Sequence, residues 1–414
     1  MRVLLLGGGG REHALGWKLA QSDRLTELVS APGNPGLEAL GSCLPGLDIT
    51  DPAAVVEAAR PADLVVIGPE APLAAGVVDA LQEAGIPAFG PTAAGARLEA
   101  SKRYAKEVMV RSGVPTAPAA AFTDGAEAAS HLADMTPPYV VKADGLAAGK
   151  GVLVTDDLIA AQAWAGLCID GHFGEAGRTV VVEEHLAGRE VSVFALCDGE
   201  RAVALQPARD YKRLGDGDTG PNTGGMGCYS PVSDLPPGLV EHTLRTVIVP
   251  VLETLAGDGI TYRGFLYAGL MLDDGDINVL EFNCRMGDPE SQVVLPRLDE
   301  DLLELLSSPI PDRQLRWHPT AAVDVVLASA GYPERSGAGV AINGLDGLGG
   351  RSDVLAFHAG TARAEDGTLT VAGGRVVNVV GLGDTVAEAR EAAYDAVAAV
   401  DFEGMQYRKD IAGR

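Results

Sequence analysis

The stretch KADGLAAGKG, residues 142–151, follows the apolar run YVV and precedes the apolar run VLV. Two short strands joined by a glycine-rich turn form a hairpin, and such a turn could close over a phosphate. A Walker loop needs four residues between its two glycines, but only three separate Gly145 from Gly149. The stretch therefore predicts a lid-like hairpin in which Lys142, at a strand end, reaches phosphate oxygens. An ordinary surface loop is the alternative.

Upstream of this hairpin, residues 1–103 alternate short apolar runs with helical stretches. The apolar runs RVLLL, LTELVS, DLVVI and IPAF each lead into a turn that contains glycine or proline. This alternation predicts an open parallel α/β sheet, which binds ligands at the carboxyl ends of its strands. We expect residues 1–103 to form a substrate-binding domain.

Downstream, the pattern is mixed. Residues 104–315 combine strands with a long helix near 235–257 and a hairpin whose turn is DDGD, residues 273–276. Residues 316–414 alternate strands and end in a helical stretch, which predicts a small α+β domain. The expected fold class is α/β and α+β multidomain.

The composition excludes several functional classes. A formal net charge of −25 argues against nucleic-acid and membrane partners. Five widely spaced cysteines form no C-x-x-C pair, which indicates a reducing compartment. No apolar run is long enough for a signal peptide or a membrane span. We expect a cytoplasmic protein.

The glycine run GGGGREHA, residues 7–14, is not a dinucleotide fingerprint. G-x-G-x-x-G counted from Gly7 ends on Glu12, and no acid follows the second strand. A nicotinamide-dependent oxidoreductase is therefore disfavoured. A turn at Gly9 and Gly10 that opens a helix can still hold a phosphate on free N–H groups. A purely structural turn is the alternative.

Two adjacent acids end the apolar strand of VVVEEHLAGRE, residues 180–190. Strand alternation points one of them inward, where Glu183 could accept a hydrogen bond from an adenine amino group. The backbone after it offers the N–H and C=O groups that adenine's edge needs, and Glu190 could accept from ribose hydroxyls. For the Glu184 side chain, a solvated strand end is the simpler interpretation.

The stretch INVLEFNCRMGDPE, residues 277–290, places polar side chains on one strand face. Glu281 and Asn283 are two apart, and such a pair can bind a hard cation that also holds phosphates. Arg285 follows on the same face and could neutralise charge on a transferring phosphoryl or acyl oxygen. A hairpin with a polar outer face is the alternative.

Residues 209–231, RDYKRLGDGDTGPNTGGMGCYSP, show no periodicity and hold five glycines between 215 and 225. Loops of this length in compact domains are functional or disordered. The mixture of acids, bases and threonines favours a substrate-binding loop.

These stretches together resemble one family. The motifs GGGGREHA, APGNPG, IGPEAPLAAGVVD, FGPTAAGARLEASK, VKADGLAAGKGV, DGDTGPNTGGMGCYSP, GFLYAGLM, EFNCRMGDPE and RKDIAGR occur in this order over nearly the whole chain. They are similar to those of the phosphoribosylamine–glycine ligases (glycinamide ribonucleotide synthetases), ATP-grasp enzymes of purine synthesis. The resemblance implies an ATP-grasp fold over 104–315, with a mobile lid subdomain over about 120–188.

The chain departs from the family pattern at three positions. Gly8 stands where asparagine is usual, Ala100 where glycine is usual, and Tyr211 where histidine is usual. A further acidic metal ligand, frequent in ATP-grasp enzymes before the EFN motif, is absent from YAGLM. These departures affect individual contacts.

The resemblance implies a role for each matching residue. Arg285 and Lys142 would stabilise charge, and Glu281 and Asn283 would form the metal site. ATP contacts fall to Lys102, Lys142, Gly149, Lys150, Glu183, Glu184, Leu186 and Glu190. Substrate contacts fall to Gly9, Gly10, Glu70, Asp210, Lys212, Asp218, Asn222, Thr223, Gly224, Asp288 and Glu290.

The implied reaction joins glycine to 5-phosphoribosylamine at the expense of ATP, with Mg²⁺ or Mn²⁺ as cofactor. It gives glycinamide ribonucleotide, ADP and phosphate through glycyl phosphate. We expect a monomer whose partners are these small molecules. The alternatives are another ATP-grasp carboxylate–amine ligase or carboxylase of purine metabolism, and a passive nucleotide-binding module.

Overall fold

The N-terminal part of the chain forms a five-stranded parallel sheet. The computed structural model describes residues 1–147, 150–273 and 275–413. The strand order is β3-β2-β1-β4-β5, and every pair is parallel, which confirms the predicted open parallel sheet. Its strands are β1 Arg2–Gly7, β2 Glu27–Pro32, β3 Ser42–Cys43, β4 Leu64–Ile67 and β5 Ala88–Phe89. The helices that follow them are α1 Gly10–Leu19, α2 Pro35–Glu38, α3 Pro52–Ala59, α4 Glu70–Ala74, α5 Val77–Glu83 and α6 Ala93–Ala100.

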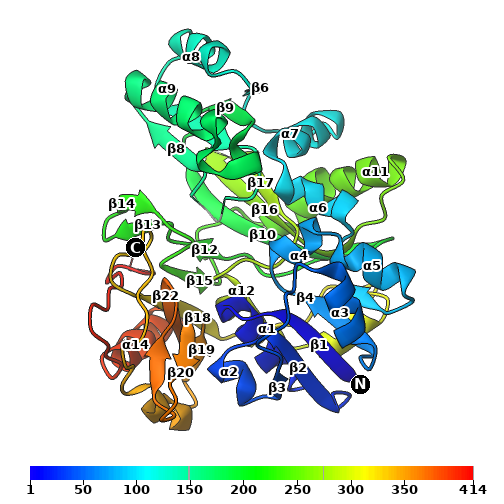
Figure 1. Ribbon diagram of the computed structural model, residues 1–414, viewed down its shortest axis with the longest axis vertical. Coiled ribbons are helices and arrows are strands. Elements are labelled where there is room, and N and C mark those ends of the chain that lie inside the picture. The colour runs from blue at the N-terminus through cyan, green and yellow to red at the C-terminus, as the bar shows by residue number, and fades with distance from the viewer. Residues whose placement is uncertain (148–149, 274, 414) are drawn as a thin grey trace.

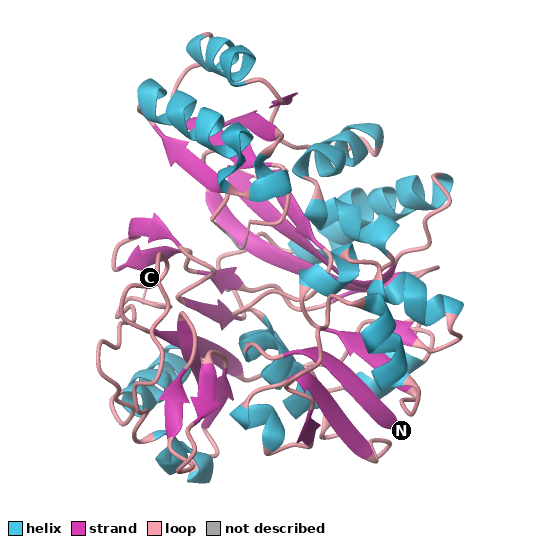
Figure 2. Cartoon of the chain, in the orientation of Figure 1, coloured by secondary structure: helices cyan, strands magenta, loops and turns pink. Residues whose placement is uncertain are grey.

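A four-stranded sheet, which we call the lid sheet, stands at the opposite end of the molecule (Figure 1). It has the order β6-β9-β7-β8, with strands β6 Ala119–Phe122, β7 Tyr139–Ala143, β8 Val152–Thr155 and β9 Val180–Glu184. α7 Lys102–Arg111 leads to it, and α8 Gly125–Ala133 and α9 Leu158–Leu167 lie against it (Figure 2). Short π and 3₁₀ turns cover Cys168–His172 and Gly174–Gly177. The predicted β7–β8 hairpin is confirmed, since Lys142 pairs with Val152.

A second four-stranded sheet, the floor sheet, lies between the lid sheet and the N-terminal sheet (Figure 1). Its order is β11-β10-β16-β17, with strands β10 Arg189–Asp198, β11 Ala202–Ala204, β16 Arg263–Asp273 and β17 Asp276–Asn283. The expected β16–β17 hairpin is confirmed. A continuous helical run comprises α10 Leu239–Thr243, a π segment Leu244–Ile248 and α11 Val249–Gly257. Further along come α12 Ser291–Val294, a 3₁₀ turn Leu295–Arg297 and α13 Leu302–Ser307.

The C-terminal residues form a small α+β domain, as predicted. Its sheet has the order β12-β15-β18-β22-β19, with strands β12 Arg209–Asp210, β15 Gly227–Ser230, β18 Ala321–Ala328, β19 Val354–His358 and β22 Arg375–Gly383. A hairpin and two helical segments complete it: β20 Thr361–Arg363, β21 Leu369–Val371, the 3₁₀ turn Leu345–Gly350 and α14 Val386–Val397. Two strands of this sheet, β12 and β15, come from the predicted substrate loop, so the loop is tied to the C-terminal domain.

The expectation that residues 209–231 lack regular structure is wrong in part. Besides β12 and β15, the stretch contains a small hairpin of β13 Arg213–Gly215 and β14 Thr219–Asn222. Its turn uses left-handed backbone at Gly217 and Asp218, with φ of 68° and 58°. Neither β13 nor β14 is buried against a core. These two strands therefore show no apolar alternation, and the sequence holds no period-2 pattern from which to predict them.

The lid sheet has an apolar core of its own. Its buried side chains, such as Leu132, Val141 and Val182, form a cluster separate from those that join the other sheets. The lid can therefore keep its internal packing independently of the floor sheet. In the part of the chain that the structure describes, no helix has the length and apolarity that a membrane crossing requires.

Candidate active site

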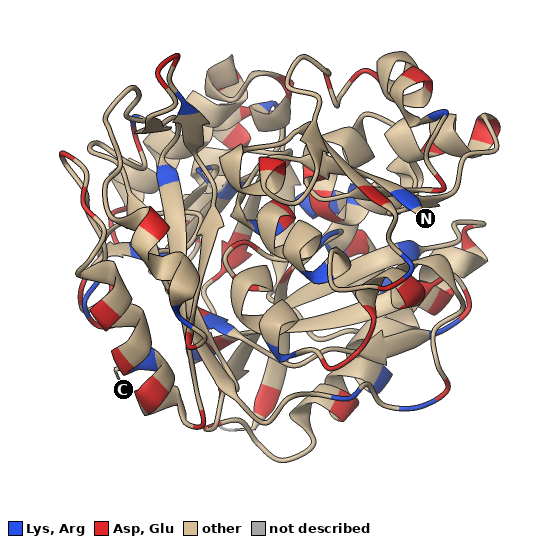
Figure 3. Cartoon of the chain, turned by 90° about the horizontal axis from the view of Figure 1, so that it is seen from below, with Lys and Arg blue, Asp and Glu red and all other residues tan. Residues whose placement is uncertain are grey.

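A cavity of about 500 Å³ lies where the lid sheet, the floor sheet, the N-terminal helices and β22 meet. The chain as a whole is acidic, with 57 acidic and 32 basic residues, and its acidic residues are spread over helices and loops (Figure 3). The cavity gathers charged residues of both signs. Its basic residues are Arg11, Lys102, Lys106, Lys142, Lys212, Arg285 and Arg375, and its acidic residues are Glu70, Glu99, Glu183, Glu184, Glu190, Asp210, Glu281, Asp288 and Glu290. Anionic and cationic groups of a ligand would both find counter-charges here.

Most of the residues predicted from the sequence line this cavity. They come from the N-terminal helices, both sheets around the cavity and the 209–231 stretch: Glu70, Lys102, Lys142, Glu183, Glu184, Leu186, Glu190, Asp210, Lys212, Asn222, Thr223, Gly224, Glu281, Asn283, Arg285, Asp288 and Glu290. The fold thus brings together motifs that are up to about 220 positions apart in the chain.

Four predicted residues do not line it: Gly9, Gly10, Lys150 and Asp218. Lys150 is exposed in the lid hairpin, and Gly149 lies outside the described residues. The Asp218 carboxylate instead pairs with the Arg408 guanidinium at 2.7 Å. That contact gives Asp218 a structural partner in the C-terminal tail.

The glycine turn is packed tightly against its surroundings. The Gly9 N–H donates to Glu12 at 2.7 Å, and α1 begins at Gly10. A Cβ atom on Gly10 would lie 2.3 Å from Asn378 Nδ2, and one on Gly8 would lie 2.5 Å from the Gly33 carbonyl oxygen. Glycine at position 8 therefore suits this backbone, whereas a larger residue would need a shift.

Three residues on the lid side form what we call the lysine cluster: Lys106, Lys142 and Glu183. One Glu183 oxygen, Oε2, lies 2.9 Å from Lys142 Nζ and 3.1 Å from Lys106 Nζ. The other, Oε1, is buried and has no hydrogen-bond partner among the described residues. Burial lowers the pKa of Lys106, and Glu183 opposes that shift. The prediction that one strand-end acid points inward is confirmed, since Glu183 is buried and Glu184 is exposed.

Lys106 was missed from the sequence. It stands four residues after Lys102 in α7, so both project from one helix face. The four-residue spacing of the two lysines was the sequence pattern that could have predicted this.

Three residues near the floor form the arginine cluster: Glu70, Glu99 and Arg285. Arg285 Nη2 lies 2.6 Å from Glu99 Oε1, and Nε lies 3.3 Å from Glu70 Oε2. Burial acts to raise the pKa of Glu70, but Arg285 and Arg11 outweigh it and lower that pKa to about 2. Burial raises the pKa of Glu99, and Arg285 opposes the shift. Glu99 was also missed from the sequence.

Glu281 and Asn283 lie at the carboxyl end of β17, beside the arginine cluster. Asn283 Oδ1 accepts from Arg285 Nη2 at 3.2 Å. Burial opposes ionisation of Glu281, but neighbouring cations, Lys212 foremost, lower its pKa. The described residues contain no group of three or more His, Cys, Asp or Glu placed to hold a metal. A carboxylate with an amide oxygen nevertheless suits Mg²⁺, which keeps waters and takes phosphate oxygens as its other ligands.

A third charged group surrounds Lys212. Its ammonium pairs with Glu190. Burial raises the pKa of Asp210 to about 8; Lys212 opposes this shift, while Glu290 and Glu190 add to it. These carboxylates provide acceptors for a bound ammonium group.

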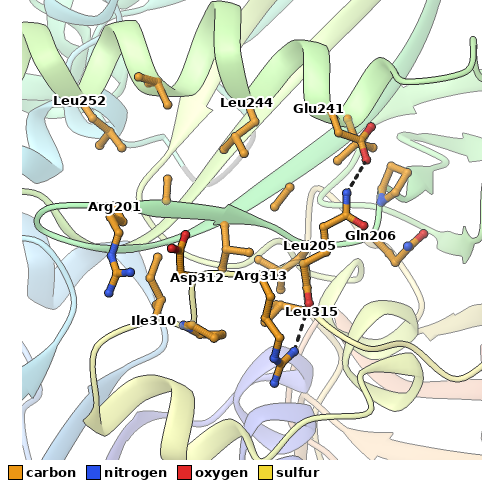
Figure 4. Close-up of a pocket in the computed structure, with 18 of the residues that line it drawn as sticks. Arg201, Leu205, Gln206, Glu241, Leu244, Leu252, Ile310, Asp312, Arg313 and Leu315 are labelled. Atoms are coloured by element: carbon orange, nitrogen blue, oxygen red, sulfur yellow. Dashed lines mark hydrogen bonds between the residues drawn. The ribbon is translucent and has the colours of Figure 1, made fainter.

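A second hollow, of about 810 Å³, lies beside the helical run and the loop at 310–317 (Figure 4). Its lining includes the apolar side chains Leu205, Leu244, Leu252, Ile310 and Leu315. None of the predicted site residues lines it. The cavity of about 500 Å³ is therefore the candidate active site.

Two antiparallel sheets that enclose a cavity, with Lys102 and Lys142 on the lid side and a carboxylate and an amide at the end of β17, form the arrangement of an ATP-grasp enzyme. Family models for phosphoribosylglycinamide synthetase match the N domain at residues 1–99, the ATP-grasp domain at 100–291 and the C domain at 322–414. The chain belongs to the phosphoribosylglycinamide synthetase family. The resemblance inferred from the motifs is confirmed.

Curated relatives match along the whole chain. The chain is 47% identical to a phosphoribosylamine–glycine ligase of Caulobacter vibrioides over 100% of this chain and 98% of the relative. It is 48% identical to one of Streptomyces coelicolor over 100% and 99%.

Among solved structures, the chain is similar to phosphoribosylamine–glycine ligase from Thermotoga maritima, with a TM-score of 0.85, 38% identity, and 99% and 100% of the two chains covered. The biotin carboxylase domain of Hydrogenobacter thermophilus 2-oxoglutarate carboxylase matches with a TM-score of 0.76 at 15% identity, over 98% and 91% of the chains. The latter likeness shows the shared fold alone. The expected fold class is confirmed.

Proposed function

We propose that this enzyme joins glycine to 5-phosphoribosylamine, with ATP converted to ADP and phosphate, and gives glycinamide ribonucleotide in purine biosynthesis. The observation that carries this function is the cavity itself. It unites lysines, a carboxylate–amide pair and Arg285 from separate elements, in a chain that matches relatives named phosphoribosylamine–glycine ligase over its full length.

ATP would lie between the lid sheet and the floor sheet. Glu183 Oε1 is a buried acceptor without a partner among the described residues, which suits an adenine amino group. The backbone at Glu184 and Leu186 would contact the adenine edge, and Glu190 the ribose. Lys102 and Lys142 would hold the phosphates, and Gly149 and Lys150 of the lid turn would cover them.

Glu281 and Asn283 would hold the divalent metal, which the family uses together with ATP. We propose Mg²⁺, with Mn²⁺ as a possible substitute. The ion would supply charge neutralisation for the phosphates of ATP. Two protein ligands suffice because phosphates and water complete the shell of such a cation.

Glycine needs activation because its carboxylate oxygen is a poor leaving group. A carboxylate oxygen attacks the γ-phosphorus of ATP, and the bond to ADP breaks, which gives glycyl phosphate. The amine nitrogen of phosphoribosylamine then attacks the acyl carbon, phosphate leaves, and the amine loses a proton. Arg285, with Lys142, would neutralise the charge that develops on the transferred group.

The remaining predicted residues would position the substrates. Glycine and the ribose phosphate would contact Gly9, Gly10, Glu70, Asp210, Lys212, Asp218, Asn222, Thr223, Gly224, Asp288 and Glu290. Asp218 lies at the edge of this set because it pairs with Arg408. Closure of the lid over about 120–188 would exclude water, which otherwise hydrolyses an acyl phosphate.

We also propose that the enzyme is a cytoplasmic monomer divided at 1–103, 104–315 and 316–414. The free cysteines are compatible with a reducing compartment. Gel filtration with light scattering would test the monomer.

The test of the function is ADP release measured with ATP, Mg²⁺, glycine and freshly formed phosphoribosylamine, each omitted in turn. Release that requires both glycine and the amine supports the proposal, and no release of ADP when both are present refutes it. A panel of other acids and amines in the same assay tests the alternative of another ATP-grasp ligase or carboxylase. ATP binding without turnover would indicate a passive nucleotide-binding module.

A further inference from the structure

Arg285 is held in place by a residue that the expected roles do not include. Glu99 is the last residue but one of α6, and its side chain is only 7% exposed. Its Oε1 lies 2.6 Å from Arg285 Nη2, and its Oε2 accepts the Cys284 backbone N–H at 2.7 Å. The Glu99 carboxylate therefore holds both the Arg285 guanidinium and the backbone N–H of the residue before it.

The other contacts of Arg285 complete its orientation. Nε donates to Glu70, Nη1 to the Met286 carbonyl oxygen, and Nη2 to Asn283 Oδ1, at 3.3, 3.2 and 3.2 Å. A guanidinium has five N–H donors in a rigid plane, so acceptors on three sides determine its tilt. The contact with Glu99 is the shortest of these.

The position of Glu99 links two parts of the site. It lies three residues before Lys102, and its backbone partner Cys284 directly follows Asn283. We propose that Glu99 is a positioning residue of the ligase reaction, which holds the Arg285 guanidinium against the end of the metal-binding strand. This inference rests on the proposed function, because it assigns the orientation of a group that the reaction uses.

Glu99→Gln tests the assignment. The amide oxygen can still accept from Cys284 N–H, whereas the charge that holds Arg285 is lost. We expect kcat to fall about 10- to 100-fold, as for other partners that orient an active-site group, while the KM for ATP changes less than about threefold. A kcat within about twofold of wild type would overturn the proposal.

A matched control is Glu300→Gln. Glu300 is also buried, pairs with Arg313 through both oxygens and accepts a backbone N–H from Arg316 at 2.9 Å, but it does not line the cavity. A similar loss of thermal stability in both variants, with a fall in kcat only for Glu99→Gln, supports a positioning role. An equal fall in kcat in both would show a merely structural one.

The double variant gives a second readout. If Glu99 acts through Arg285, Glu99→Gln adds no further loss of kcat to Arg285→Lys. Additive losses would overturn the proposal.

Should Glu99→Gln fail to fold, Glu99→Asp is the second variant. It retains the charge, retracts it by one methylene, and must still lower kcat. An inactive wild type would instead refute the proposed function.

Discussion

The lysine cluster and the arginine cluster have opposite ratios of cations to carboxylates. On the lid side, two ammonium groups share the Glu183 carboxylate, which leaves a positive charge in excess. On the floor side, the Arg285 guanidinium is shared by two carboxylates, and Arg11 lies 3.8 Å from one of them, Glu70. Buried ion pairs add little to stability because desolvation offsets their attraction. The contrast therefore points to a ligand on the lid side: the excess positive charge of the lysine cluster suits a polyphosphate, whereas the carboxylates of the arginine cluster already have cations beside them.

The largest effect should come from Glu281→Gln, which removes the carboxylate proposed to bind the metal. We expect kcat to fall about 10³-fold, since a charge facing the transferred group contributes most in the transition state. The melting temperature should change little because the side chain faces the cavity. Steady-state ADP release at saturating Mg²⁺ checks this, with exposed Asp276→Asn on the same hairpin as the control. Undiminished turnover would remove Glu281 from the metal site.

Lys142→Met breaks the lysine cluster on the side proposed to contact phosphate. We expect the KM for ATP to rise about 30-fold, because a charge-assisted contact to a phosphate oxygen contributes about 1.5–3 kcal/mol. The KM for glycine should change little. Nucleotide titrations measure the effect, and an unchanged ATP affinity would assign the phosphates to other cations.

Glu70→Gln tests the arginine cluster through the pH dependence of the unfolding free energy. A carboxyl whose pKa is about 2 in the folded chain stabilises the fold above its unfolded pKa of about 4.3. That contribution disappears as the pH falls from about 4.3 toward about 2. We expect the variant to lose about 1–2 kcal/mol of unfolding free energy at pH 7, after allowance for partial solvent screening. Urea unfolding at pH 7 and pH 3 should show the difference shrinking; a gap that widens at low pH would contradict the pairing.

The smallest effect is expected for Lys106→Met, which leaves Glu183 paired with Lys142 alone. Lys106 also donates to Thr116 Oγ1 at 2.7 Å, so its ammonium group is partly satisfied within the protein. The KM for ATP should rise only about threefold. If Lys106→Met were more damaging than Lys142→Met, the assignment of the two lysines would have to be exchanged.

The parts of the site that strand geometry determines were predictable from the sequence. Alternation and strand ends placed Lys142, Glu183, Glu281 and Asn283 toward one cavity, because side chains at a strand end project in a known direction. The parallel N-terminal sheet followed from the same patterns.

Contacts between distant segments were not predictable in this way. Cys284 donates to Glu99 across 185 positions of the chain, and no local pattern carries such a pairing. Arg375 enters the cavity from the C-terminal sheet, where it donates to the Gly224 and Asp288 carbonyl oxygens at 2.7 and 2.6 Å. Which arginine reaches which loop depends on how the sheets pack, and a single sequence does not encode that locally.

The departure at Tyr211 has a local explanation. Its hydroxyl accepts the Ala412 backbone N–H at 2.9 Å, and Arg408 lies 4.7 Å above its ring. Tyrosine here secures the last residues of the chain. We see no structural consequence of Ala100.

The fully buried Arg408 side chain imposes an order on biosynthesis. It donates to the Arg213 carbonyl oxygen and to Asp218, which stands 190 positions earlier. At about 5–20 residues per second, a ribosome needs roughly 10–40 s to travel between these two codons. During that interval the hairpin at 213–222 lacks its anchor, so it can take its final shape only after Arg408 has been synthesised.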